Sequence, residues 1–152
     1  MTQNDNQSSA QDELALLLDE LRSFSANRDA DIHRKCITNL YYAAFHAVRA
    51  LLFWHGYETK SHEGTQRLFA AHFVKPGVMQ RAHLKCLATL ESDRLRADYQ
   101  GFYRFDAQDV ADSRGCVAAL VRASIDYLSE QDKTVSSNLQ PALDDALAQM
   151  ME

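Results

Sequence analysis

Apolar side chains between residues 36 and 52 recur at steps of three and four residues, and they cover two faces of a helix. No Gly or Pro interrupts this stretch. A helix that is apolar on two faces usually lies in the middle of a bundle, with neighbours on both sides. We therefore predict a central helix from about residue 31 to residue 55, with Gly56 as its C-cap.

The same spacing predicts further helices before and after this one. They cover about residues 11–27, the stretch between Ser61 and Pro76, about residues 78–100 and about residues 107–130. On the helix over 78–100, the residues expected to face inward are Leu84, Leu87, Ala88 and Leu95. No segment shows the alternation of a β-strand. The pattern therefore predicts an all-α fold, an antiparallel bundle of four to five helices with short connections.

The length of 152 residues is most simply that of one domain, which we place at residues 11–131. Residues 1–10 are mostly polar and are expected to be disordered. In the tail, residues 132–152, apolar side chains recur at helical spacing after Pro141. The tail therefore either forms one short amphipathic helix or frays.

Charge and cysteine usage narrow the functional classes. The net charge of −5 does not attract a polyanion, so contact with a nucleic acid requires a local basic patch. The three cysteines, Cys36, Cys86 and Cys116, include no closely spaced pair, and we expect them to be small buried side chains in a reducing cytoplasm. No leader and no membrane-spanning run is visible. No motif indicates a cofactor, and we expect no metal site.

A polar stripe on the central helix is the first candidate for chemistry. It contains Asn39, Tyr42, His46 and Arg49 within one arc. Such a stripe either faces water or neighbouring helices, or forms one wall of a groove for RNA or a nucleotide. In the second case Tyr stacks on a base and Arg contacts a phosphate.

Several short motifs together are similar to a known family. In chain order they are Tyr41-Tyr42-Ala43-Ala44-Phe45, Arg49-Ala50-Leu51-Leu52, Gly56, Lys60-Ser61-His62-Glu63-Gly64, Phe69, Phe73-Val74, Gly77, Arg94 and Ala97-Asp98-Tyr99. Over about residues 30–130 the chain resembles the HEPN superfamily, in a branch of small prokaryotic proteins. The resemblance implies a bundle of four or five helices that forms a homodimer. It also implies a nucleotidyltransferase partner in a toxin–antitoxin or defence system.

The resemblance also implies a reaction. Many HEPN proteins are metal-independent ribonucleases that carry an Arg, then four to six other residues, then a His. Arg94 matches that Arg, but Tyr99 stands where active members have His. A phenol with a pKa of about 10 replaces an imidazole poorly near neutral pH, so the sequence leaves enzymatic activity open.

The remaining candidates lie around these motifs. Arg94 and Asp98 either form an ion pair within one helix or bind a phosphate together. Lys60 and His62 lie at a helix start, which favours an anion. Tyr99 begins a cluster that either packs at a helix corner or binds a ligand: Tyr99, Phe102, Tyr103, Arg104 and Phe105.

The sequence therefore predicts a HEPN-like module that binds RNA or a nucleotide. The binding residues are expected to be Asn39, Tyr42, His46, Arg49, Lys60, Asp98 and Tyr99. The alternative is an active endoribonuclease toxin, in which Arg94 acts with His62 or His46.

Overall fold

The computed structural model describes residues 2–152, and these residues form helices without any β-strand. The elements are α1 (Gln3–Asp29), α2 (His33–Trp54), α3 (His62–Phe69), a π-helical turn η1 (Ala70–Val74), α4 (Arg81–Tyr99), α5 (Ala107–Gln131) and α6 (Gln140–Met150). The prediction of an all-α bundle is confirmed. Within this described part, no helix is long and apolar enough to cross a membrane.

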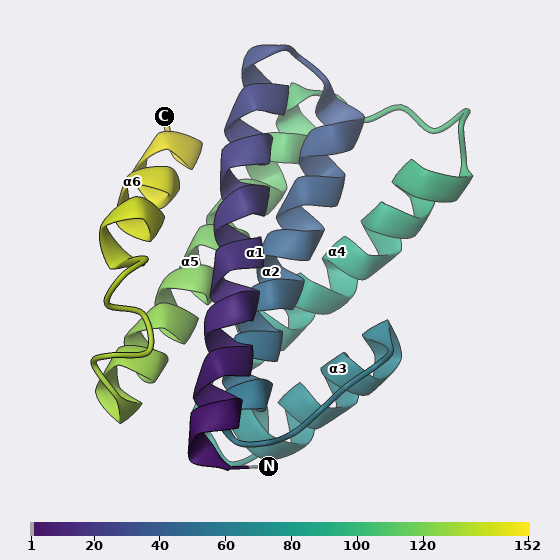
Figure 1. The fold of residues 1–152 in the computed structure, drawn as a ribbon. Helices are drawn as coiled ribbons and strands as arrows, with labels where there is room; N and C mark the ends of the chain where they lie inside the picture. The colour runs from purple at the N-terminus through teal and green to yellow at the C-terminus, as the bar shows by residue number, and fades with distance from the viewer. Residues whose placement is uncertain (1) are drawn as a thin grey trace.

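Helix α2 is the centre of the bundle, as its two apolar faces predict. It packs against α1, α5, α4 and α3. Figure 1 shows α1 and α2 side by side, α5 behind them, α4 crossing at one side and α6 covering the other side. The short helix α3 lies below α4 in that view. The connection after α2 begins at Gly56, whose φ of 80° is in the left-handed region that glycine adopts easily.

The start of the chain is more ordered than predicted, and the tail adopts one of the two predicted alternatives. Helix α1 begins at Gln3 because Thr2 and Asp5 form a reciprocal capping box, so the prediction of disorder is wrong for residues 3–10. Met1 lies outside the described residues. At the other end, the tail forms helix α6, which packs against α1.

Helix α4 is rotated relative to the prediction. Its buried face consists of His83, Cys86, Leu87, Leu90, Arg94 and Ala97. Leu95, which was expected to face inward, is 42% exposed, and Ala88 is exposed as well. Arg94 thus occupies a core-facing position of the helix, one that usually carries an apolar residue.

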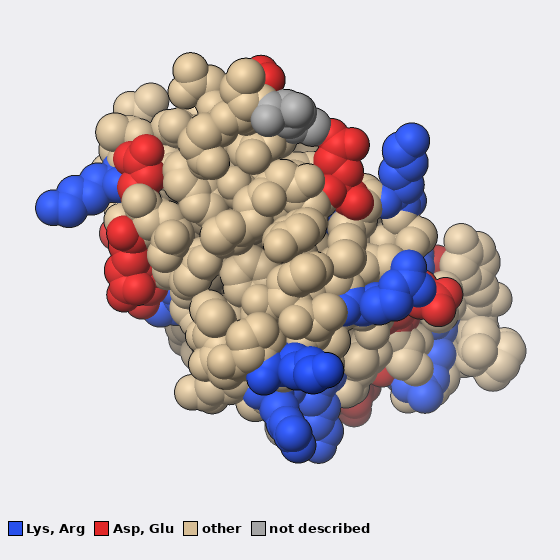
Figure 2. Space-filling view, turned by 90° about the horizontal axis from the view of Figure 1, so that it is seen from below, with Lys and Arg blue, Asp and Glu red and all other residues tan. Residues whose placement is uncertain are grey.

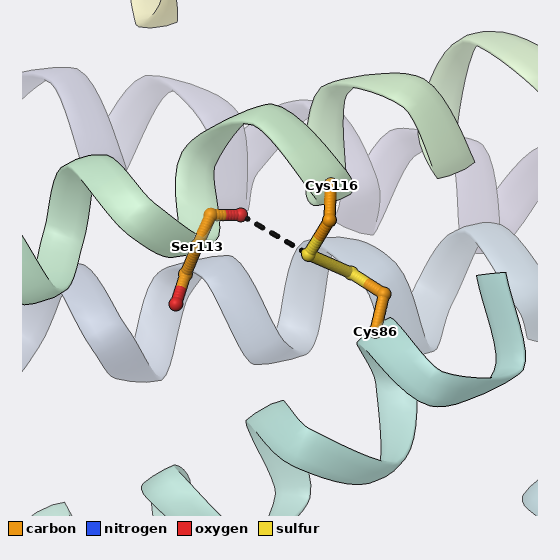
Figure 3. Close-up of a disulfide and its surroundings, with 3 residues drawn as sticks. All are labelled: Cys86, Ser113 and Cys116. Carbon is orange, nitrogen blue, oxygen red and sulfur yellow. Dashed lines mark hydrogen bonds between the residues drawn. A yellow bond between two sulfur atoms is a disulfide. The ribbon is translucent and has the colours of Figure 1, made fainter. Parts of the chain in front are cut away.

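Two of the three cysteines are not free thiols. Cys86 on α4 and Cys116 on α5 form a disulfide, which Figure 3 shows between the two helices. The prediction of unpaired buried cysteines is therefore wrong for this pair. It fails because two helices that lie side by side can align residues that are 30 positions apart in the sequence. Cys36 alone remains free and buried.

Candidate functional site at the junction of α2, α3 and α4

Arg94 is buried at the centre of the site and is held by two carboxylates of its own helix. Its Nε and Nη2 atoms donate to Glu91 at 3.3 and 3.0 Å, and its Nη1 atom donates to Asp98 at 3.0 Å. Only 7% of the residue is exposed. The hydrogen bonds to Glu91 raise the pKa of Arg94 further above its usual value, so the guanidinium stays charged. Both alternatives for Arg94 and Asp98 start from this ion pair.

Two tyrosines of α2 contact the guanidinium of Arg94 with their rings. The Cζ atom of Arg94 lies 5.3 Å from the centre of the Tyr41 ring and 5.8 Å from that of Tyr42. Such contacts between a cation and an aromatic face are attractive, more so where water is excluded. Burial is the main reason why the pKa of each tyrosine is raised, so both rings keep their hydroxyl protons. The tyrosines therefore fix Arg94 of α4 against α2.

His62 completes the cluster from a third element. It is the first residue of α3, directly after Ser61, whose side chain caps that helix. Its Nδ1 atom lies 2.6 Å from the Tyr41 hydroxyl and 3.8 Å from a carboxylate oxygen of Glu91. Burial lowers the pKa of His62 below its usual 6.5, with Glu91 opposing this shift and Arg94 adding to it. At neutral pH the imidazole is therefore uncharged and can accept a proton.

Glu91 links the two functional side chains. Its carboxylate forms an ion pair with Arg94 and lies beside His62. Burial alone would raise the pKa of Glu91, but hydrogen bonds from Arg94 and Tyr41 lower it below its usual value. We refer to Tyr41, Tyr42, His62, Glu91, Arg94 and Asp98 as the Arg94 cluster.

The Arg94 cluster combines a buried, fixed cation with a neutral imidazole that is partly exposed. A guanidinium has five N–H groups, and the three hydrogen bonds described above leave two of them for another acceptor. The side chain of His62 is 36% exposed, so an external molecule can reach it. A phosphodiester is a ligand of suitable chemistry, because it accepts hydrogen bonds and carries a negative charge.

Two residues of the polar stripe of α2 are paired with side chains of helix α1. Asn39 donates to Glu20 at 2.8 Å and accepts from Asn27 at 2.7 Å. His46 lies 2.6 Å from Glu13 through its Nδ1 atom. The structure thus gives these two stripe residues partners on a neighbouring helix, one of the alternatives that the sequence left open.

The other two residues of the stripe point to different places. Tyr42 belongs to the Arg94 cluster. Arg49 lies 3.4 Å from Glu13 and packs its guanidinium over Phe53 at 4.7 Å. Arg49 and Lys60 line a cavity, which is described below. The stripe is therefore not one continuous wall.

The aromatic cluster after α4 is split between the core and the surface. Tyr99 is 76% exposed and Phe102 is 81% exposed. Tyr103 and Phe105 are half-buried and contact each other, with 4.7 Å between their ring centres. Arg34 of α2 donates to the carbonyl groups of Ala97 and Tyr103 and so holds the end of α4 in place. Tyr99, the residue in the position of the family's His, points to solvent.

Two members of the Arg94 cluster were not predicted from the sequence. Tyr41 reads as an apolar residue of α2, but a buried tyrosine hydroxyl needs a partner, and His62 provides one. Glu91 was not singled out, although its position three residues before Arg94 puts both side chains on one helix face. Within residues 2–152, no group of three or more His, Cys, Asp or Glu side chains could hold a metal ion.

Comparison with known proteins agrees with this architecture. The chain is 39% identical over 61 residues to the UPF0332 protein PH1297 of Pyrococcus horikoshii, a match that covers 40% of this chain and 43% of the relative. It is 29% identical over 68 residues to the protein named “Putative toxin MJ0605” of Methanocaldococcus jannaschii, covering 45% of this chain and 51% of the relative. The chain thus matches about half the length of each curated relative.

The family assignment covers most of the bundle. Residues 18–127 match the family model of the HEPN domain, from the middle of α1 to the last turn of α5. This range includes every residue of the Arg94 cluster. The chain therefore belongs to the HEPN domain family.

Proposed function

We propose that this protein is a HEPN toxin module that binds RNA or a nucleotide at the Arg94 cluster. The observation that carries this proposal is the meeting of Arg94 and His62 around Glu91, contributed by two different helices. Family membership supports it, and so does the relative that is named as a toxin. We further propose that the module is a cytoplasmic homodimer and that it acts with a nucleotidyltransferase-type partner in a toxin–antitoxin or defence system.

Binding is tested with a short single-stranded RNA and purified protein at several salt concentrations. The variant His62→Gln should bind more weakly than the wild type, because a ligand on the cluster contacts this exposed side chain. His72→Gln is the matched control. His72 follows Arg67 at the spacing at which Tyr99 follows Arg94, but it lies outside the cluster. Affinity should fall steeply as salt rises, as expected for phosphate contacts. Equal affinity of both variants and the wild type would contradict the proposed site.

The second candidate function is RNA cleavage by the same cluster. His62 accepts the proton of a ribose 2′-hydroxyl group, and the 2′-oxygen attacks the adjacent phosphorus. The bond from phosphorus to the 5′-oxygen then breaks, water protonates the leaving oxygen, and Arg94 compensates the charge on the phosphate. His62 suits this role better than His46, because His46 is less exposed and its Nδ1 atom is paired with Glu13.

Cleavage is tested by incubation of total RNA with the protein in EDTA. The wild type should cleave, and Arg94→Ala and His62→Gln should each lose activity by about 100-fold or more, as is typical for loss of an acid–base group. Because Arg94→Ala leaves Glu91 without its partner, circular dichroism must show that the variant is folded. His62→Gln removes an accessible side chain and keeps the test valid if Arg94→Ala unfolds. Absence of cleavage by the wild type on several RNAs would refute this second function.

A further inference from the structure

A cavity of about 230 Å³ lies between the start of α1 and the end of α2, outside the Arg94 cluster. The connection after α2 forms its third side. The residues that line it are Asn6, Ser9, Arg49, Phe53, Gly56, Glu58, Thr59 and Lys60. It belongs to the end of the molecule that Figure 2 shows, where uncharged side chains cover the middle and charged side chains of both signs stand at the edge.

Two cationic side chains line this cavity. The guanidinium of Arg49 is fixed between two aromatic rings, with its Cζ atom 5.3 Å from the centre of Phe45 and 4.7 Å from that of Phe53. It forms an ion pair with Glu13 at 3.4 Å through Nη2. Lys60 is exposed and forms no ion pair with any residue from 2 to 152. Lys60 and the free edge of Arg49 can therefore hold an anion between them.

Two buried polar atoms of the lining have no partner. They are the Nε atom of Arg49 and the Oδ1 atom of Asn6, and no hydrogen bond to either is found among the described residues. Buried polar groups in native proteins are nearly always paired, so each such atom requires an explanation. One of them donates and the other accepts. A polar molecule in the cavity, with a small rotation of either side chain, would satisfy both.

The polar start of α1 builds one wall of this cavity. Residues 3–9 are almost entirely exposed or half-buried, and they contribute no side chain to the apolar core. They nevertheless continue the helix, and Asn6 and Ser9 face the end of α2. At Gly56, a Cβ atom would lie 3.2 Å from the Asn6 side chain, so glycine keeps this approach open in addition to allowing the positive φ.

We propose that the cavity binds a small phosphate ester, with the phosphate on Lys60 and Arg49. The hydroxyl groups of the ligand bond to the carboxylate of Glu58 and to the side chains of Asn6 and Ser9. The cavity is smaller than the roughly 300–1,000 Å³ of sites for drug-sized molecules, so it accommodates a molecule of the size of a pentose phosphate. The same chemistry is offered by the terminal 5′-phosphate nucleotide of an RNA. The inference does not depend on binding or cleavage at the Arg94 cluster.

The proposal is tested by calorimetric titration of the full chain with ribose 5-phosphate and, separately, with ribose. Ribose 5-phosphate should bind at one site per chain, and ribose should bind far more weakly. Lys60→Ala should weaken the binding of ribose 5-phosphate by about tenfold, as expected for the loss of one charge-assisted contact. Lys35→Ala is its control, because Lys35 is exposed at the start of α2 and the cavity lies at the end of that helix.

A second pair of variants tests the cavity without changing its charge. Ser9→Phe fills the cavity and should abolish binding, whereas Ser8→Phe places the same ring on the exposed side of α1 and should bind like the wild type. Circular dichroism checks that both variants fold. If Ser9→Phe does not fold, the result with Lys60→Ala decides.

The outcomes distinguish the two sources of the phosphate. Binding of ribose 5-phosphate that Ser9→Phe abolishes supports a free small molecule. If ribose 5-phosphate does not bind but a 5′-phosphorylated RNA does, and Ser9→Phe weakens the binding of this RNA more than that of the 5′-hydroxyl RNA, the phosphate belongs to RNA. If neither ligand responds to Lys60→Ala or Ser9→Phe, the proposal is overturned. The variant His62→Gln should leave the titration with ribose 5-phosphate unchanged, so failure at the Arg94 cluster is recognised separately.

Discussion

Two glutamates in this protein each hold one arginine and one histidine, and the two groups differ in what surrounds them. Glu13 of α1 lies 2.6 Å from His46 and 3.4 Å from Arg49, both on α2. Glu91 of α4 lies 3.0 Å from Arg94 and 3.8 Å from His62. The residue types are the same, but only in the second group is the histidine open to an external ligand.

Accessibility and remaining bonding capacity separate the two groups. His46 is 14% exposed at its side chain and is tied directly to the carboxylate through Nδ1. His62 is 36% exposed and turns its Nδ1 toward the Tyr41 hydroxyl, so its other ring nitrogen is left for a ligand. His46 therefore joins two helices, whereas His62 can also meet an external molecule.

The largest expected effect comes from breaking the Glu13 group. Glu13→Gln should lower the free energy of unfolding by about 3–5 kcal/mol, because Arg49 and His46 lose a buried carboxylate. Glu91→Gln should cost only about 1–2 kcal/mol, since Arg94 keeps its bond to Asp98. Urea denaturation at neutral pH measures both values.

RNA binding by the same two variants should show the opposite order of effects. Glu91→Gln should reduce RNA binding strongly, and Glu13→Gln should leave it close to that of the wild type as long as the protein is folded. If the two variants cost the same stability and affect RNA binding equally, the assignment of a structural role to one group and a functional role to the other is wrong.

The sequence predicts the position of these groups only in part. Helical spacing correctly places α2 in the middle of the bundle, because the period of its apolar residues extends over several turns. The same pattern does not reveal that Arg94 lies on the buried face of α4, since an arginine in a helix is normally taken as a surface residue. Leu95 was placed inward for that reason.

Contacts between distant segments could not be derived from local patterns, and the pairing of Arg94 with His62 was only one of two alternatives. The proximity of His62 to Glu91 depends on how α3 lies against α4, and no local pattern carries that information. The same holds for the pairing of Cys86 with Cys116. The helical start of α1 was missed because its polar composition resembles that of a disordered segment, although Thr2 and Asp5 form a recognisable capping box.

The disulfide gives the second prediction. It closes a loop of 30 residues that includes Glu91, Arg94 and Asp98 but no part of the Glu13 group. Replacing both cysteines by Ser should lower the free energy of unfolding by about 3–4 kcal/mol, as the loop entropy of the unfolded chain predicts. Urea denaturation of the double variant beside the wild type measures this difference.

Hydrogen exchange then shows where the lost stability is located. In the double variant, the amide protons of α4 should exchange faster, while those of α1 near Glu13 should change less. Addition of a dithiol to the wild type should reproduce the result, because it reduces the disulfide to two thiols. A uniform increase in exchange over all helices would contradict a local role of the disulfide at the Arg94 cluster.

The smallest effect concerns the proton on His62. Burial lowers its pKa below 6.5 while the charge of Glu91 opposes the shift, so a midpoint below 6.5 is expected when its ring protons are titrated by NMR. The folded state then binds fewer protons than the unfolded state, and the stability that His62 contributes is complete above about pH 6.5 and lost as pH falls toward the lower folded pKa. Glu91→Gln should lower the midpoint further, and Glu13→Gln should change it less, since Glu13 reaches His62 only through Arg49, whose charge also lowers the His62 pKa. A midpoint above 6.5 would mean that the attraction of Glu91 outweighs burial, and His62 would then be largely protonated when it meets a phosphate and could not serve as a base.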